Sequence, residues 1–376
     1  MSMAKEKTKK KKGPVREWFD SVLFAVVAAT LIRWMFLEAY TIPTGSMEKS
    51  LLINDFLFVS KVHYGTRAPM TPLQVPLTHQ KIWFTDIPSY SDLIELPYFR
   101  FPGFTHVKNG DVVVFNYPGC PERPDEFGGF DKYPVDLRTN YIKRCIGTPG
   151  DKITLKDTQV YINDKPMENP PGMQKWYTLE SNTSVNPNVW KKYDVTERGS
   201  GSQGNKYYYA INATESAVKD LEALDFVSSV YPDIIAADDS LTPFKTFPYR
   251  PDLVNWNRDN FGPITVPKKG MTVDLTNELN FALYKGIITT FDHNDNAEVK
   301  DGKVYIDGQV ITKYTFNQDY YFMMGDNRYE SDDSRYWGFV PEDHVVGKAL
   351  LIWMSIDADG NFLNKIRWKR LFSLIK

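Results

Sequence analysis

The sequence has 376 residues, of which 42% are hydrophobic and 24% are charged. This composition is that of a globular protein and excludes a disordered or collagen-like chain. The formal net charge of −2 gives no overall attraction to nucleic acid, and two cysteines cannot form a disulfide-rich scaffold or a four-thiolate zinc site. HExxH and P-loop motifs are absent from the sequence, so we expect no metal and no cofactor.

A lysine-rich segment, residues 1–16, comes first and an apolar stretch follows it. Trp18 to Leu37 counts 20 residues, about 30 Å of helix, which matches the hydrocarbon core of a bilayer. We therefore expect a transmembrane anchor over residues 17–39, ended by Pro43 about one turn beyond the apolar stretch.

The uncharged part of this stretch, Ser21 to Ile32, is short for a membrane span, so a buried or surface amphipathic helix is an alternative. A cleavable signal peptide is another, but Arg33 and the bulky residues after it leave no small-residue cleavage site. Because lysine-rich flanks tend to stay cytoplasmic, we expect a single-pass protein of the cell membrane with a cytoplasmic N-terminus. The rest of the chain then lies on the outer, periplasmic or extracellular, face.

Beyond the anchor the pattern becomes that of β-strands. Residues 55–62, 111–117 and 152–155 are rich in β-branched and aromatic residues. Residues 159–167 and 303–311 each place a turn pair, Asn-Asp or Asp-Gly, after Val-Tyr-Ile. These pairs favour two-residue turns, so we predict two β-hairpins rather than an internal repeat.

Residues 168–300 differ in composition and indicate an insertion or second lobe, with a helix near residues 215–229. The Gly- and Ser-rich residues 199–205 predict a loop. The basic residues 366–376 are typical either of a frayed tail or of an amphipathic segment on the membrane surface.

Ser46 follows Gly45 directly after the anchor and is a candidate nucleophile. No histidine has the context of a catalytic triad, which leaves lysine as the candidate base. A free lysine keeps its proton at neutral pH, so such a base must have its pKa lowered by about 3 units through burial. Lys143 fits, because it lies within an apolar strand pattern in residues 140–151, where the alternative is a strand lysine that reaches solvent.

Residues 320–341 (YYFMMGDNRYESDDSRYWGFVP) combine polar residues with flanking aromatic ones. A polar loop between two strands is the simplest interpretation. Asp326, Asp332 and Asp333 suggest calcium, but the spacing of an EF-hand and its terminal glutamate are missing.

Taken together and in this order, the motifs resemble type I signal peptidases, the membrane-bound Ser/Lys leader peptidases. The resemblance lies in IPTGSM (42–47), GDVVVF (110–115), YIKRCIGTPGD (141–151) and GDNRYESDDSRYWGFVP (325–341). It implies a mainly β fold: an antiparallel catalytic core with one N-terminal transmembrane helix and a large α/β or irregular insertion.

The resemblance also implies an activity, a membrane-anchored serine endopeptidase that removes N-terminal signal peptides from exported preproteins after small residues of the Ala-x-Ala type. Its partners would be the signal peptides of secreted preproteins and membrane lipid, with no nucleic acid; the oligomeric state stays open. The implied domains are a cytoplasmic basic segment (1–16), the anchor (17–39), a first segment of the catalytic core (40–167), an insertion or cap lobe (168–300), a second segment of the catalytic core (301–352) and a basic amphipathic C-terminal segment (353–376).

Carried over to this chain, the resemblance makes Ser46 the nucleophile and Lys143 the general base. The Ser46 N–H and the Thr44 hydroxyl would form the oxyanion hole. The residues implied to orient or support the base are Ser331, expected to hydrogen-bond the lysine, the ion pair Asp333 and Arg335, and the nearby carboxylate Asp326. The residues implied to bind substrate are Ile42, Pro43, Met47, Leu51, Tyr141 and Ile142, for each of which an ordinary core position is the alternative.

The chain departs from the usual motif after the nucleophile. Lys49 stands where the family commonly has proline, Ser50 where it has threonine, and Asn54 where many members have glycine. The missing proline relaxes the local turn, whereas asparagine tolerates left-handed backbone. Cys145 is expected to be buried rather than bridged.

Two other functions compete. One is a membrane-anchored β domain that binds peptides without cutting them, which would not need both Ser46 and Lys143. The other is a self-cleaving Ser/Lys regulator of similar core fold, which the anchor and the lack of a DNA-binding segment disfavour.

Overall fold

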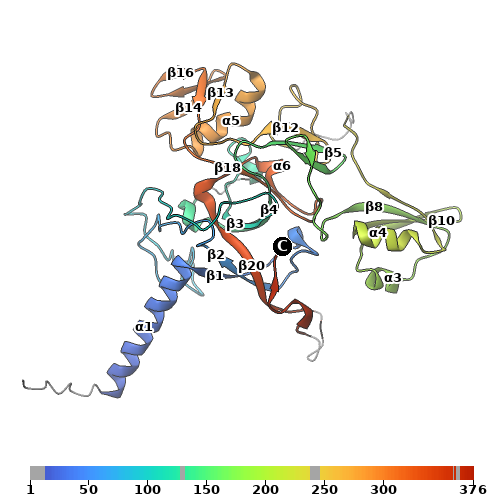
Figure 1. Ribbon diagram of the computed structural model, residues 1–376, viewed down its shortest axis with the longest axis horizontal. Coiled ribbons are helices and arrows are strands. Elements are labelled where there is room, and N and C mark those ends of the chain that lie inside the picture. Colours follow the sequence, from blue (N-terminus) through green and yellow to red (C-terminus); the bar gives the residue numbers. More distant parts are fainter. Residues whose placement is uncertain (1–12, 128–131, 238–245, 359, 361–364) are drawn as a thin grey trace, which may run out of the picture.

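The computed structural model describes residues 13–127, 132–237, 246–358, 360 and 365–376 (Figure 1). Most of the predicted cytoplasmic segment, residues 1–12, lies outside the described residues. The fold is mainly β, as predicted, and every pairing between named strands is antiparallel.

Helix α1 (Pro14–Met35) stands apart from the rest of the molecule (Figure 1) and has no buried residue. It is long and apolar enough to cross a membrane. The expected boundary at its C-terminal end is wrong: the helix ends at Met35, well before Pro43, because Leu37–Thr41 forms strand β1 and pairs with Phe56–Ser60. Pairing with a distant strand, rather than proline, stops the helix.

The central sheet carries the segments that the motifs singled out. Its strands, in spatial order, are β1 (Leu37–Thr41), β2 (Asp55–Ser60), β20 (Val345–Ser355), β3 (Val112–Asn116), β4 (Asn140–Gly147), β18 (Tyr320–Met324) and β19 (Val340–Pro341), with β21 (Ser373–Leu374) also on β20. Thus β1, β4 and β18, which are far apart in sequence, belong to one sheet. The C-terminal residues form a 3₁₀ turn, η4 (Trp368–Arg370), and strand β21, which pairs with β20, rather than a frayed tail.

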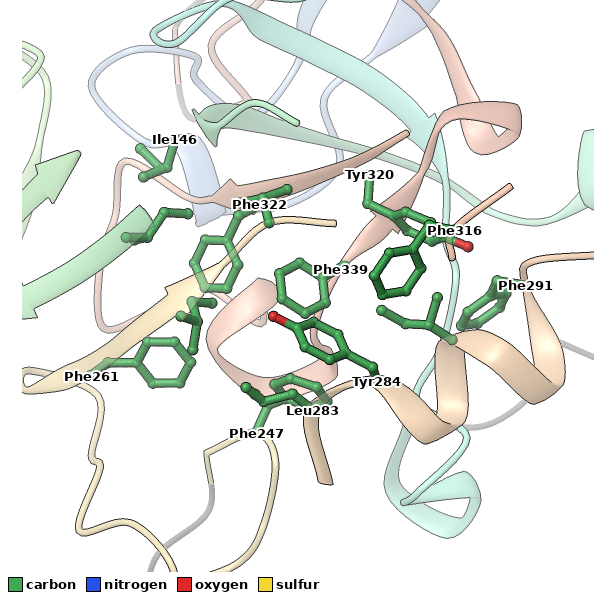
Figure 2. Packing of buried hydrophobic residues seen from close by; sticks show 14 of the residues in the cluster. Ile146, Phe247, Phe261, Leu283, Tyr284, Phe291, Phe316, Tyr320, Phe322 and Phe339 are labelled. Atoms are coloured by element: carbon green, nitrogen blue, oxygen red, sulfur yellow. The ribbon is translucent and has the colours of Figure 1, made fainter. Parts of the chain in front are cut away.

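A second group of strands packs on this sheet through aromatic side chains. The group comprises β12 (Phe261–Thr265), β5 (Lys152–Lys156), β6 (Gln159–Ile162), β7 (Lys165–Pro166), β13 (Thr272–Asp274), β17 (Lys313–Thr315), β14 (Ala297–Lys300), β15 (Lys303–Ile306), β16 (Gln309–Ile311) and helix α5 (Glu278–Thr290). Figure 2 shows Phe322 of β18 packed among aromatic rings from these elements, and the same cluster includes Ile153 of β5.

Both predicted hairpins are confirmed. Strands β6 and β7 join through Asn163 and Asp164, and β15 and β16 join through Asp307 and Gly308. All four turn residues have positive φ, between 51° and 76°. This is the left-handed backbone that a two-residue hairpin turn requires.

A lobe with its own core stands to one side of the central sheet, on the right in Figure 1. It consists of β8 (Gln174–Ser181), α3 (Pro187–Lys192), β9 (Thr196–Gln203), β10 (Lys206–Thr214), α4 (Glu215–Glu222) and β11 (Val227–Pro232). Predicted residues 215–229 are therefore helical only to Glu222. Within residues 168–300 this lobe comes first, and residues from Phe261 onward belong to the second group of strands. The division into core and insertion stays a prediction.

The expectation of a loop at residues 199–205 is wrong for most of its length. Residues up to Gln203 belong to β9, an exposed edge strand that pairs with β10. Its glycines and serines have little preference for strands, but the tyrosine-rich partner strand supplies the ladder. The remaining helical turns are α2 (Pro124–Phe127), η1 (Gly45–Met47), η2 (Val135–Leu137), α6 (Ser334–Trp337) and η3 (Glu342–His344).

Candidate active site

Ser46 lies in the loop between β1 and β2. The base of the loop is closed by two backbone hydrogen bonds, from Ile42 N–H to the Asp55 carbonyl and from Asn54 N–H to the Ile42 carbonyl, each 2.9 Å. Within it, Ser46 occupies the short 3₁₀ helix η1 and is half-buried. The loop thus presents the hydroxyl on a tight turn held by the central sheet.

The departure from the family motif at Lys49 has a structural reason. Lys49 has φ +68°, whereas proline is locked near −65° and cannot adopt this backbone. Lys49 also forms an ion pair of 2.7 Å with Asp194 of the lobe. Asn54 has φ +64°, which agrees with its predicted tolerance of left-handed backbone.

Lys143 projects from β4 toward this turn. Its Nζ lies 2.6 Å from the Ser46 Oγ, and the residue is only 3% exposed. Burial lowers the pKa of Lys143 to about 8, since it penalises the charged ammonium more than the charge of Asp333 favours it. An amine with this pKa is partly unprotonated near neutral pH, which is what a general base requires.

Asp333 and Arg335 form the expected buried ion pair. The Arg335 Nε and Nη2 donate to the two carboxylate oxygens of Asp333, each at 2.9 Å. The Gly325 N–H also donates to Asp333, at 3.1 Å. The pair thereby ties α6 to the backbone next to the candidate site.

Ser331 is close to the site but does not make the expected contact. Its Oγ is buried and has no hydrogen-bond partner among the described residues, so the predicted bond to Lys143 is not formed. A Cβ placed on Gly325 would lie 2.2 Å from this Oγ and 2.5 Å from the Ser46 carbonyl oxygen. Glycine at 325 is therefore what allows these two serine residues to approach each other.

Asp326 supports the nucleophile loop rather than the lysine. Arg144 binds its carboxylate with two hydrogen bonds, of 2.8 and 2.7 Å, and the Ser50 hydroxyl donates a third of 2.5 Å. The Asp326 N–H contacts the Met47 Sδ at 3.4 Å. The hydroxyl that replaces threonine at position 50 is therefore in use, and Arg144 is a supporting residue that sequence reasoning missed.

The residues predicted to bind substrate fall into two groups. Ile42, Met47 and Leu51 are buried in an apolar cluster with Leu57 and Val112, and half-buried Ile142 packs against it. They pack beneath the turn that carries Ser46. Their burial therefore also agrees with the alternative interpretation, that of ordinary core residues.

The second group reaches the surface. Pro43 is exposed, and half-buried Tyr141 stacks on Tyr117 with ring centroids 4.5 Å apart. The exposed Thr44 precedes η1 and makes no capping hydrogen bond with its side chain. The Ser46 N–H belongs to the first turn of this short helix, where amides have no intrahelical acceptor.

Asn327 was also missed by sequence reasoning. Its N–H donates to the Ser46 carbonyl at 3.1 Å, and its Nδ2 donates to the Gly45 carbonyl at 3.0 Å. An asparagine in a polar loop carries no pattern that distinguishes it from a solvated turn residue. Its place inside the motif at residues 325–341 was the one available indication.

The expected burial of Cys145 is confirmed. Cys120 and Cys145 are both free and buried in one apolar cluster. Burial raises the pKa of the Cys120 thiol to about 12. Both thiols therefore stay protonated and behave as small core residues.

A serine hydroxyl beside a buried amine on a mainly β scaffold is an arrangement that a serine peptidase can use. The family model described as signal peptidase, peptidase S26, matches residues 15–217 and 312–354. The chain belongs to this family.

Curated relatives agree with this assignment. Signal peptidase I of Buchnera aphidicola subsp. Acyrthosiphon pisum (strain APS) is 27% identical over 337 residues, 89% of this chain and 74% of the relative. Signal peptidase I of Buchnera aphidicola subsp. Baizongia pistaciae (strain Bp) is 25% identical over 371 residues, 98% of this chain and 87% of the relative. Signal peptidase I of Rickettsia canadensis (strain McKiel) is 36% identical over 163 residues, 43% of this chain and 48% of the relative.

Proposed function

We propose that this chain is a membrane-anchored serine endopeptidase that removes N-terminal signal peptides from exported preproteins, using Ser46 as nucleophile and Lys143 as general base. The observation that carries the proposal is the 2.6 Å distance between the Lys143 Nζ and the Ser46 Oγ. Family membership supports the reaction, and the lowered pKa of Lys143 supports the role of the amine.

In the first step, the unprotonated Lys143 amine accepts the proton of the Ser46 hydroxyl as its oxygen attacks the scissile carbonyl carbon. The resulting ammonium then donates that proton to the departing amine, which leaves an ester between Ser46 and the signal peptide. In the second step, the same amine accepts a proton from a water molecule as the water oxygen attacks the ester carbonyl. The ammonium returns that proton to the Ser46 Oγ as the ester bond breaks, which releases the signal peptide as a carboxylic acid and restores the serine. One buried amine thus acts twice as base and twice as acid.

Charge develops on the substrate carbonyl oxygen in both steps. The Ser46 N–H and the Thr44 hydroxyl are the proposed donors to this oxyanion, because neither is committed to capping η1. Loss of one such donor typically costs about 2.7–4 kcal/mol of transition-state stabilisation.

Substrate would bind as an added strand. Residues 140–143 of β4 pair with β3 on one side, while β18 pairs with β4 only from Arg144 onward. Strand β1 is terminal in the described central sheet. These two edges suit an extended peptide, and the closely packed cluster of Ile42, Met47 and Leu51 favours small side chains of the Ala-x-Ala type.

In the proposed topology α1 crosses the cell membrane once, with the N-terminus cytoplasmic and the β domain on the outer face. Its apolar surface lacks protein cover among the described residues, as lipid contact requires. The lysine-rich residues before it fit the cytoplasmic side.

The test is mass spectrometry of a model preprotein incubated with the purified protein in detergent. Wild type should release the mature protein at one bond after Ala-x-Ala, and Ser46→Ala and Lys143→Ala should each leave the preprotein intact. Thr78→Ala removes a hydroxyl that donates to the Val75 carbonyl and contacts neither Ser46 nor Lys143 through a hydrogen bond, so this control variant should keep activity. Substantial processing by either site variant, when folded, would reject the proposed chemistry.

A further inference from the structure

One side chain of the lobe contacts Asn327, the residue that hydrogen-bonds the backbone of the Ser46 turn. The Asn212 Nδ2, on β10, donates a hydrogen bond of 3.0 Å to the Asn327 Oδ1. Both residues are buried, at 2% and 1% exposure. Since Asn327 itself holds the carbonyls of Gly45 and Ser46, two hydrogen bonds in series connect the lobe to the backbone of the serine turn.

The chemistry of the groups fixes which one donates and which one accepts in each of these two hydrogen bonds. The Gly45 carbonyl can only accept, so Asn327 must direct its amide NH₂ group toward it. The Asn327 oxygen then faces Asn212 and needs a donor, which the Asn212 NH₂ group supplies. The donor at Asn212 therefore determines which way the Asn327 amide is oriented.

The lobe is held at this point by backbone bonds as well. The Gln174 N–H donates to the Asp326 carbonyl at 2.9 Å, and the Arg328 N–H donates to the Gln174 carbonyl at 3.0 Å. Gln174, the first residue of β8, thus hydrogen-bonds the residues immediately before and after Asn327. Asn212 lies opposite Trp176 in the β8–β10 register, so its distance from Asn327 is set by strand pairing.

We propose that Asn212 is a positioning residue for Ser46, acting through Asn327. Asn212 contacts neither the serine hydroxyl nor the lysine amine; it orients the amide that fixes the turn on which the serine lies. The inference rests on the proposed role of Ser46 and assigns the lobe a role in catalysis.

The expected effect follows from geometry. In Asn212→Asp a carboxylate of the same shape replaces the donor and faces the Asn327 oxygen. The Asn327 amide then either is repelled or turns over, and in both cases the Gly45 carbonyl loses its donor. Because the serine and lysine must meet within hydrogen-bond distance, a shift of about 1 Å lowers turnover by about 100-fold at most.

The experiment measures kcat and KM of the full-length protein in detergent on a fluorogenic Ala-x-Ala peptide. The variants are Asn212→Asp, Asn212→Ala, Asn327→Ala and the double variant Asn212→Asp/Asn327→Ala. We expect Asn212→Asp to lower kcat by about tenfold or more with KM changed less than twofold and with the midpoint of the pH profile unchanged. The double variant should be no slower than Asn327→Ala, since residues that act in series show non-additive effects.

The matched control is Asn182→Asp, the same change on the same lobe. Asn182 is exposed and its side chain accepts a hydrogen bond from Ser228 within the lobe, so this variant should match wild type. A second control is Leu221→Ala, which removes a side chain from the lobe core. It should lower the stability of the lobe to proteolysis while a folded sample keeps kcat.

Three results would overturn the inference: wild-type kcat in Asn212→Asp and Asn212→Ala, effects of Asn212 and Asn327 that add, or an equal loss of kcat in folded Leu221→Ala. Asn212→Ala introduces no charge, so it decides the question if the aspartate variant does not fold. Failure of the proposed function is distinguishable, because Ser46→Ala would then cleave the same peptide as fast as wild type.

Discussion

The proposed role of Lys143 as general base depends on its burial, and the same burial carries an energetic penalty. Because the pKa of Lys143 is lowered to about 8, only about a tenth of the amine is unprotonated at pH 7. We expect kcat/KM of the wild type to rise about tenfold per pH unit below pH 8 and to level off above it. A peptide-cleavage assay between pH 5.5 and 10 checks this, and a rate still rising steeply from pH 9 to 10 would contradict the lowered pKa.

The same shift predicts a change in stability. Below pH 8 both the folded and the unfolded chain hold the proton, and the folded state bears the cost of the buried charge, about 3 kcal/mol. Between pH 8 and 10.5 only the unfolded chain holds it, so the contribution of Lys143 to stability grows with pH in this window.

Lys143→Met should therefore raise the free energy of unfolding at pH 7 by about 1–3 kcal/mol while abolishing cleavage. Denaturant unfolding at pH 7 and pH 10 provides the measurement. The gain should shrink at the higher pH, and equal gains at both values would argue against a buried ammonium as the cause.

At the scale of elements, the turn after the nucleophile depends on backbone that proline cannot adopt. Restoring the family residue with Lys49→Pro should strain the turn by about 1–3 kcal/mol and lower kcat by tenfold or more, since φ at this position is +68°. Lys49→Gly, which tolerates positive φ and loses only the ion pair with exposed Asp194, should stay within a few-fold of wild type. Kinetics and thermal unfolding compare the two variants; equal activity would show that the turn adapts.

Elements defined by local chemistry could be predicted from the sequence, whereas those defined by distant partners could not. The hairpins at residues 159–167 and 303–311 were predictable because their turn residues must adopt positive φ. The end of α1 and the strand β9 were not, because pairing with β2 and β10 decides them.

The site divides in the same way. Ser46 and Lys143, the proposed nucleophile and base, could be singled out from the sequence because these roles need particular residue types in a particular context. The residue types of Asn212 and Asn327 did not point to a role, since the role of an asparagine amide depends on the group that it hydrogen-bonds in the folded protein. The missing bond of Ser331 likewise depends on side-chain orientation, which no motif specifies.

At the scale of the whole molecule, α1 and the β domain are expected to contribute separately. Removing residues 1–29 leaves the contacts of Arg33 and Trp34 with the domain in place. This variant should cleave a soluble peptide at the wild-type rate but process a preprotein embedded in vesicles at least tenfold more slowly, because the anchor raises the local concentration of enzyme on a membrane-held substrate. Both rates are measured with the same enzyme preparation, and an equal loss on both substrates would point to damage of the domain instead.

Strand β1 begins two residues after α1 ends and leads to the serine turn. Its five residues are hydrogen-bonded to β2, so they form a stiff spacer of about 17 Å rather than a slack tether. A spacer of constant length sets the height at which the scissile bond must be offered. In the proposed topology, substrates whose apolar segment is too long or too short by several residues would present the wrong bond, so that α1 and β1 together would set the position of cleavage.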